Sequence, residues 1–210
     1  MLRTVDAPSP ASVAELHRRR PAFGMIEREA RALALPAFGY RIVPVVEVRG
    51  EAIDVGEAIL HAPGLAAESG GLRAVAAAAC TLGTAIQDRI SALFEARQPS
   101  RALALDIASN ELLFRLADRV LAAIRREARR DGLLIGIDLS PGDPGVPLGQ
   151  QTAVLGLADA ARQGIATTEA GMLFPVKSLS FVVALGSTLR RRSTSGRCNC
   201  CPSRERCTVK

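Results

Sequence analysis

The pattern of apolar and polar residues predicts helices and strands in an irregular order. Residues 25–35 have a helical composition and stop before Pro36, whereas residues 40–50 are rich in β-branched residues and end in glycine. Pro44 lies within this second run, and proline in a sheet is confined to edge strands or bulges. We therefore expect a helix followed by a strand that lies at a sheet edge or contains a bulge, with a short partner strand in residues 51–56.

The middle of the chain predicts one long helix, from about residue 101 to residue 130. Its apolar residues recur at helical spacing: Leu105, Leu112, Leu113, Leu116, Val120, Leu121 and Ile124. The preceding run, 72–83, is apolar throughout, and its periodicity does not distinguish a buried strand from a helix. Cys80 within this run is expected to be a small buried hydrophobic residue. A shorter helix is expected from Thr84 to Phe94.

The second half contributes a strand at 133–139, a helix from about 150 to 162 and a final strand at 177–186. Residues 140–149 hold three prolines and three glycines, so they cannot form regular structure. Helices and strands do not alternate as regular βαβ units. The sequence therefore predicts an α+β fold with a mainly antiparallel sheet.

Charge and composition divide the chain of 210 residues into three parts. The net charge of +6 belongs to residues 187–210, which hold seven Lys or Arg and one Glu, so the remainder is balanced. We predict a flexible segment at 1–24, one domain at 25–186 and a basic, cysteine-rich tail at 187–210. A nucleic-acid-binding domain is disfavoured because the excess of positive charge is restricted to the tail.

The chain is expected to be cytoplasmic. No apolar run approaches the roughly 18 residues that suggest a membrane-spanning helix, and the N-terminus lacks the pattern of a signal peptide. Stable disulfides are disfavoured in the cytoplasm, where clustered cysteines more often bind metal or do redox work.

Four cysteines in the tail are candidate metal ligands: Cys198, Cys200, Cys201 and Cys207. Four thiolates suit zinc or an iron–sulfur cluster. Cys200 and Cys201 are adjacent and therefore awkward as ligands of one small site. The alternative is a tail of free thiols that binds no metal.

The loop 140–149 is the other candidate site. Its prolines fix the backbone, and its glycines admit a close approach to a ligand. Such a loop between a strand and a helix can present carbonyl and amide groups to a ligand, or it can be a structural turn. The helix charges Asp106 and Glu111 are interpreted first as solvated.

The order of several motifs resembles that in the activation domain of cobalamin-dependent methionine synthase, in its small stand-alone form. The motifs are CTLGTAIQDRI (80–90), LDIASNELLFRLADRV (105–120), SPGDPGVPLGQQ (140–151), GIATTEAGMLFPVKSLSFVVALG (164–186) and the cysteine tail. The most specific parts are the SPG loop and the stretch Pro175, Lys177, Ser178 and Ser180. The resemblance implies an α+β domain that binds S-adenosylmethionine and docks on a cobalamin domain. There, an electron from a reductant protein and a methyl group from S-adenosylmethionine restore methylcobalamin.

The resemblance also implies the candidate cofactor-binding residues Glu111, Asp138, Ser140, Pro141, Gly142 and Asp143. Pro141 and Gly142 match the family loop Arg-x-x-Pro-Gly-Tyr, whereas Asp138 stands at its Arg position and Asp143 at its Tyr position. Glu111 corresponds to an acidic helix residue that meets the amino group of the ligand. An Asp in place of the Arg repels a carboxylate but can meet an ammonium or sulfonium charge.

Two functions follow from the resemblance. The chain would assist the reductive reactivation, by remethylation, of a corrinoid methyltransferase on another chain, and would not be a complete enzyme alone. Alternatively, it would be a non-catalytic regulatory or metal-binding partner of a corrinoid protein that no longer binds S-adenosylmethionine. A third hypothesis, a small nucleic-acid-binding protein with a zinc tail, is disfavoured by the balanced charge of the domain.

Overall fold

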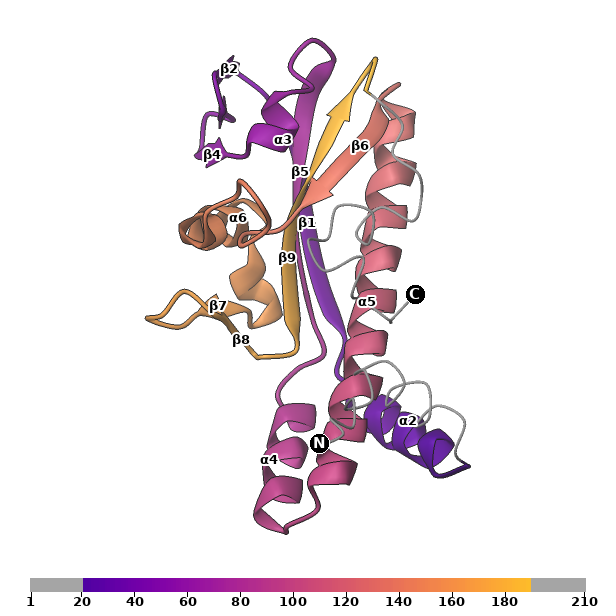
Figure 1. Ribbon diagram of the computed structural model, residues 1–210. Coiled ribbons are helices and arrows are strands. Elements are labelled where there is room, and N and C mark those ends of the chain that lie inside the picture. Colours follow the sequence, from indigo (N-terminus) through magenta and orange to yellow (C-terminus); the bar gives the residue numbers. More distant parts are fainter. Residues whose placement is uncertain (1–20, 190–210) are drawn as a thin grey trace, which may run out of the picture.

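A four-stranded antiparallel sheet forms the centre of the fold in the computed structural model, which describes residues 21–189 (Figure 1). Its strands lie in the order β1-β5-β9-β6. They are β1 (Ala37–Pro44), β5 (Leu72–Thr81), β9 (Ser178–Gly186) and β6 (Leu134–Leu139). Each neighbouring pair is antiparallel, so the predicted α+β fold with a mainly antiparallel sheet is confirmed.

Helices cover one face of this sheet, and the longest is α5 (Pro99–Arg130). The apolar stripe predicted from the sequence is the face that α5 buries, and its fully buried residues include Leu105, Val120 and Ile124. Pro99 suits the first turn of the helix, where its missing N–H has no intrahelical acceptor to lose. Two shorter helices, α2 (Pro21–Leu33) and α4 (Ala85–Glu95), pack against α5 near its N-terminal end.

Shorter elements cover the opposite face of the sheet (Figure 1). They are α3 (Pro63–Ala66), η1 (Leu148–Gln150), α6 (Gln151–Leu157), η2 (Ala160–Gln163), a small sheet of β2 (Glu47–Arg49), β3 (Ala52–Asp54) and β4 (Ile59–His61), and the hairpin of β7 (Ala166–Thr167) and β8 (Leu173–Phe174). The central sheet thus lies between two apolar cores, one under α5 and one under α3 and α6.

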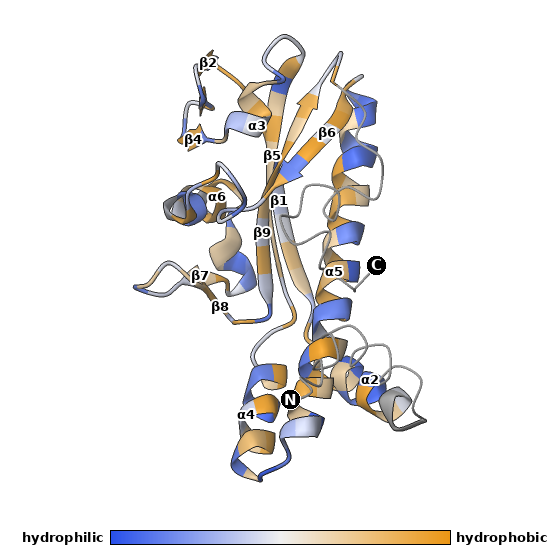
Figure 2. Cartoon of the chain, viewed as in Figure 1, coloured by the Kyte–Doolittle hydropathy of each residue, from blue (hydrophilic) through white to orange (hydrophobic). Residues whose placement is uncertain are grey.

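The apolar run at 72–83 forms the strand β5 rather than a helix. β5 lies between β1 and β9, and its alternate residues enter the two cores: Ala76 and Ala78 face α5, whereas Ala77 and Ala79 face the side of α6. A strand buried on both faces needs no polar positions, which is why the sequence lacks the alternation of a half-buried strand. Figure 2 shows the central strands as largely hydrophobic and α5 as blue along its outer side.

Two predicted elements are interrupted in the structure. The strand expected at 40–50 is divided, because β1 ends at Pro44 at the edge of the central sheet and β2 belongs to the small sheet. The helix expected at 150–162 is divided between α6 and η2 by Asp159, whose φ of 51° lies in the left-handed region. Of the two positions predicted for Pro44, an edge strand or a bulge, the structure shows the edge strand.

The packed part of the chain extends slightly beyond the predicted domain limits. α2 begins at Pro21, and Leu189 is buried in the core under α6. The N–H of Ser187 donates to the carbonyl oxygen of Gly71 at 3.1 Å. Residues 1–20 and 190–210, which contain most of the two predicted terminal segments, lie outside the described residues. None of the helices between residues 21 and 189 is long and apolar enough to cross a membrane.

Glu29 fixes α2 to the other two helices on its face. Its carboxylate accepts hydrogen bonds from the Arg89 Nε and the Arg101 Nη2, both at 2.8 Å. Burial alone would raise the pKa of Glu29, but the hydrogen bonds from Arg101 and Arg89 outweigh it and hold the pKa below its ordinary value.

We expect Glu29→Gln to lower the free energy of unfolding by about 1–2 kcal/mol at pH 7, because two charge-assisted hydrogen bonds are weakened. The pKa of Glu29 is lower in the folded state, so its stabilisation is full above the unfolded pKa and is lost as the pH falls through the folded value. Urea unfolding at pH 7 and pH 3 measures this loss. Glu95→Gln, at an exposed position on α4, is the matched control. The prediction would be contradicted if the difference in the free energy of unfolding between wild type and Glu29→Gln were larger at pH 3 than at pH 7.

Candidate functional site

The central sheet has an open stretch along β9. β6 pairs with β9 only from Val182 to Gly186, because Leu139, the last residue of β6, lies opposite Val182. Within the described residues, no strand therefore pairs with 178–181 on this side of β9. The chain leaves β6 here and enters the loop 140–149, the loop singled out from the sequence.

The loop 140–149 is closed by its own hydrogen bonds. The N–H of Ser140 donates to the Asp143 Oδ2 at 2.7 Å, and the N–H of Asp143 donates to the Ser140 carbonyl at 2.9 Å. Gly142 has a φ of 95°, which a residue with a side chain rarely adopts, and its N–H donates to the carbonyl of Val146. Val146 is buried in the core under α6. The loop is therefore a rigid turn with one anchored end.

A buried lysine lies where β9 begins. Lys177 is only 5% exposed, and its Nζ donates to the Asp106 Oδ1 at 2.6 Å and to the Asn110 Oδ1 at 2.7 Å. Asn110 also donates from its Nδ2 to the Asp106 Oδ2 at 3.2 Å. Both partners lie on α5, so this cluster ties the start of β9 to the N-terminal half of the long helix. The Asp106 side chain remains 42% exposed and open to solvent.

Hydroxyl groups fix the backbone around Lys177. The Thr81 hydroxyl donates to the carbonyl of Lys177 at 3.2 Å and accepts from the Ser178 hydroxyl at 2.8 Å. Further along β9, the Ser180 hydroxyl accepts a hydrogen bond from the side-chain amide of Gln151 on α6. The polar residues of the stretch 177–180 are thus buried and satisfied. They hold β9 in place between the two helical layers.

Comparison with known proteins identifies the architecture. No family model and no curated protein matches the chain in sequence. Among solved structures, one described as the crystal structure of the MetH reactivation domain bound to AdoHcy superposes with a TM-score of 0.62. The match covers 90% of this chain and 73% of that chain at 13% identity. This chain has the fold of the MetH reactivation domain. The predicted resemblance is therefore confirmed at the level of the fold.

The predicted binding residues lie in three parts of this fold: the turn after β6, the strand β6 itself and the helix α5. Ser140, Pro141, Gly142 and Asp143 form the turn that follows β6, whereas Asp138 lies within β6, opposite Val183. Ile137 and Leu139 on either side of Asp138 pack toward the core under α6. Side chains alternate along a strand, so Asp138 lies on the face that α5 covers. Asp143, by contrast, is engaged within the turn.

Glu111 belongs to a different part of the fold. It contacts Arg115 at 3.7 Å and lines a small pocket with Glu27 and Arg31 of α2. A neighbouring pocket shared by Arg31 and Arg115 reaches Pro36, just before β1. β1 and β6 are opposite edges of the sheet. The structure therefore does not bring Glu111 to the loop, and the α5 residues that face the start of β9 are Asp106 and Asn110.

The sequence contains only a partial signal for this cluster. Asp106 and Asn110 are four residues apart and so share a helix face, and Lys177 was part of the most specific motif. Nothing in the sequence indicates that these distant segments meet. The interpretation of Asp106 as a solvated charge is incomplete, because it pairs with Lys177.

The predicted metal site of the cysteine tail stays a prediction. Cys198, Cys200, Cys201 and Cys207 lie outside the described residues. Between residues 21 and 189, no three potential ligands among His, Cys, Asp and Glu come together around a point. Cys80 is fully buried and forms no disulfide with any residue between 21 and 189, as expected for a small core residue.

Proposed function

We propose that this chain is an accessory protein that docks on a corrinoid methyltransferase carried by another chain and supports its reductive remethylation. The observation that carries the proposal is the reactivation-domain fold over 90% of the chain, combined with a Pro-Gly turn beside the open stretch of β9. The corrinoid would belong to the partner and would supply the cobalt that accepts the electron and the methyl group.

The residues of this chain would bind and orient the methyl donor. The turn 140–143 is closed by its own hydrogen bonds, and the start of β9 is fixed to α5 through Lys177, Asp106 and Asn110. Groups that are already fixed suit a ligand that must be held in one orientation, because little ordering is needed when it binds.

Exposed apolar side chains beside the turn support docking on a partner. Leu148 follows the turn, and Met172, Phe174 and Val176 lie in and after the β7–β8 hairpin, all at least 41% exposed. The Leu148 side chain lies 3.9 Å from the position that a Cβ on Gly171 would occupy, so the two segments are neighbours. Exposed apolar patches of this kind are typical of interaction surfaces.

S-adenosylmethionine is the ligand that we propose for the site between the turn 140–143 and the start of β9. The similar solved domain is described as bound to AdoHcy, the demethylated form of that donor. Asp138 adds negative charge where the family pattern has an arginine. S-adenosylmethionine carries a positive sulfonium that AdoHcy lacks. A carboxylate at 138 therefore favours the methyl donor over its product and promotes release after methyl transfer.

We expect calorimetry to show tighter binding of S-adenosylmethionine than of AdoHcy, and Asp138→Asn to reduce that preference by about fivefold, the upper end for a partly exposed charge pair. Asp131→Asn, at an exposed position after α5, is the control for net charge.

A second experiment tests the reactivation itself. The chain is mixed with methionine synthase that lacks its own reactivation domain and holds inert cob(II)alamin, with titanium(III) citrate as reductant. Methylcobalamin, followed by its visible spectrum, should form only when the chain and the methyl donor are both present. Equal spectra with and without the chain would contradict the proposed function.

A second candidate function is a ligand-free regulatory partner of the corrinoid protein. The hydrogen bond from the N–H of Ser140 to Asp143 favours it, because this carboxylate is engaged in the turn where the family pattern has a tyrosine. No heat with either nucleoside ligand, together with co-elution with the corrinoid protein, would support this function over the first.

The cysteine tail remains a predicted zinc or iron–sulfur site that would serve as a structural clip or as the entry point for an electron. Metal analysis of protein purified without oxygen, beside a variant that ends after Leu189, tests it. The variant should retain Leu189 because this residue is buried in the core under α6.

A further inference from the structure

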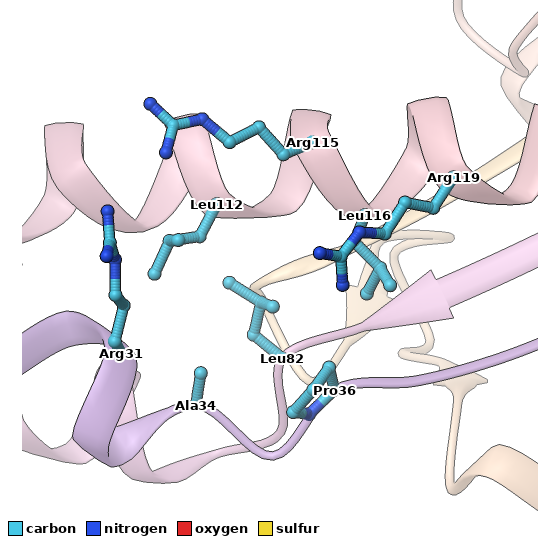
Figure 3. A pocket seen from close by; sticks show the side chains of 8 residues that line it. All are labelled: Arg31, Ala34, Pro36, Leu82, Leu112, Arg115, Leu116 and Arg119. Carbon is cyan, nitrogen blue, oxygen red and sulfur yellow. The ribbon is translucent and has the colours of Figure 1, made fainter.

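A pocket of about 430 Å³ lies on the flank of α5 away from the turn 140–143 (Figure 3). It is formed where α2, the segment before β1 and the end of β5 meet α5. Leu82, Leu112, Leu116, Ala34 and Pro36 provide its apolar lining. A volume of this size lies within the range of about 300–1,000 Å³ that is usual for small-molecule sites.

Three arginines surround this apolar lining: Arg31 from α2, and Arg115 and Arg119 from α5. Figure 3 shows Arg31 and Arg115 at one end of the leucine side chains and Arg119 at the other. Residues 112, 115, 116 and 119 recur at helical spacing, so they share one flank of α5. Two leucines and two arginines on the same flank give a surface that is apolar at its base and cationic at its rim.

The three guanidinium groups are not equally neutralised. The Arg31 guanidinium lies 3.5 Å from the Glu27 carboxylate, and the Arg115 guanidinium lies 3.7 Å from the Glu111 carboxylate. Both ion pairs lie within a single helix, and both arginine side chains are more than half exposed. The Arg119 side chain is exposed, and its guanidinium makes no ion pair or hydrogen bond with any residue between 21 and 189. The positive charge available to a ligand is therefore concentrated at Arg119, with weaker support from the other two.

The walls of the pocket are fixed before any ligand binds. Glu29 ties α2 to Arg89 and Arg101, and Ala30 of α2 is buried in the core under α5. The N–H of Leu35 donates to the carbonyl of Leu82 at 2.9 Å, which holds the segment before β1 against the end of β5. A pre-formed pocket with a cationic rim loses little entropy when it binds an anion.

We infer that this pocket binds a small organic oxyanion with an apolar body, a carboxylate or a phosphate ester. Its acidic group would be held by the Arg119 guanidinium, whose planar fork matches both kinds of oxyanion, and its body would cover Leu82, Leu112 and Leu116. This site is separate from the turn 140–143 and from Asp138, so the inference goes beyond the proposed function and does not depend on it.

The test uses the full chain and four probes, measured by calorimetry at low salt. Phenyl phosphate and benzoate carry both an apolar body and an acidic group, whereas inorganic phosphate lacks the body and benzyl alcohol lacks the charge. We expect saturable binding of at least one of the first two, at least tenfold tighter than that of the last two. The tighter of phenyl phosphate and benzoate identifies the acidic group that the pocket prefers. Addition of 0.5 M NaCl should weaken the binding of the preferred probe, because the arginine charges at the rim of the pocket are exposed.

Arg119→Gln separates this pocket from the basic tail. The variant should bind the preferred probe about tenfold more weakly, because one charge-assisted hydrogen bond is lost. Arg129→Gln removes the same charge from the exposed end of α5, outside the pocket, and should bind as the wild type does. Equal weakening in both variants, unchanged binding in Arg119→Gln or equal affinity for inorganic phosphate would overturn the inference. Unchanged thermal unfolding of Arg119→Gln serves as the folding control.

Discussion

Asp106→Ala is expected to lower the free energy of unfolding by about 3 kcal/mol, whereas Lys177→Met should cost only about 1 kcal/mol. Removal of one partner from a buried ion pair is costly when the remaining charge has no route to water. Lys177 is 5% exposed, so without Asp106 the one acceptor left to its ammonium between residues 21 and 189 is the amide oxygen of Asn110. Asp106 is 42% exposed, so without Lys177 its carboxylate is hydrated instead.

Urea unfolding of the two single variants and the double variant measures this asymmetry. Asp118→Ala, at an exposed position on the same helix, is the matched control and should change stability by less than about 0.5 kcal/mol. Equal costs for Asp106→Ala and Lys177→Met would show that the pair behaves as an ordinary surface salt bridge. The double variant should be more stable than Asp106→Ala, because the stranded charge is removed with its partner.

Gly186→Ala is expected to destabilise the protein by at least about 3 kcal/mol, or to prevent folding. Gly186 ends β9, where it lies opposite Leu72 of β5 and Leu134 of β6. A Cβ at this position would lie 1.9 Å from the carbonyl oxygen of Gly71. The obstruction is backbone, and the same carbonyl accepts a hydrogen bond from Ser187, so relief of the clash would also disturb the end of the sheet.

Gly156→Ala is expected to stabilise the protein, in contrast to Gly186→Ala. Gly156 lies within α6, and nothing lies within 4 Å of the position that its Cβ would take. Alanine there should raise the free energy of unfolding by about 0.5–1 kcal/mol, because glycine is the poorer helix former. Thermal unfolding of both variants measures the two effects. A stable, normally folded Gly186→Ala would show that Gly71 and Ser187 can move at little cost.

The rigidity of the two candidate sites has different origins. The turn 140–143 is stiff because of local hydrogen bonds and a glycine in the left-handed region. The arginine pocket is stiff because α2 is held by ion pairs and by buried contacts with the other helices. A change in Glu29 should therefore loosen the pocket and leave the turn unaffected, which makes the two sites separable in experiments.

Local patterns in the sequence determined the elements that have a strong periodicity. α5 follows directly from apolar residues at helical spacing, and β6 and β9 follow from short β-branched runs closed by turn residues. Pro44 identified an edge strand for the same reason, because a proline cannot donate to a neighbouring strand. The Pro-Gly turn could also be predicted from the sequence, because the backbone conformations of its prolines and glycines are set by the residues themselves. In each case, the constraint lies within a few neighbouring residues.

Only the tertiary structure decided the features that depend on distant residues. β5 could not be distinguished from a helix because its alanines and Val75 are buried on both faces, and burial is a property of its neighbours. The pairing of Lys177 with Asp106 and the separation of Glu111 from the turn follow from how α5 crosses the sheet. Arg31, Arg115 and Arg119 form one rim only because α2 packs against α5. The sequence thus determined the elements through local backbone and side-chain preferences, and packing between distant elements decided which side chains share a site.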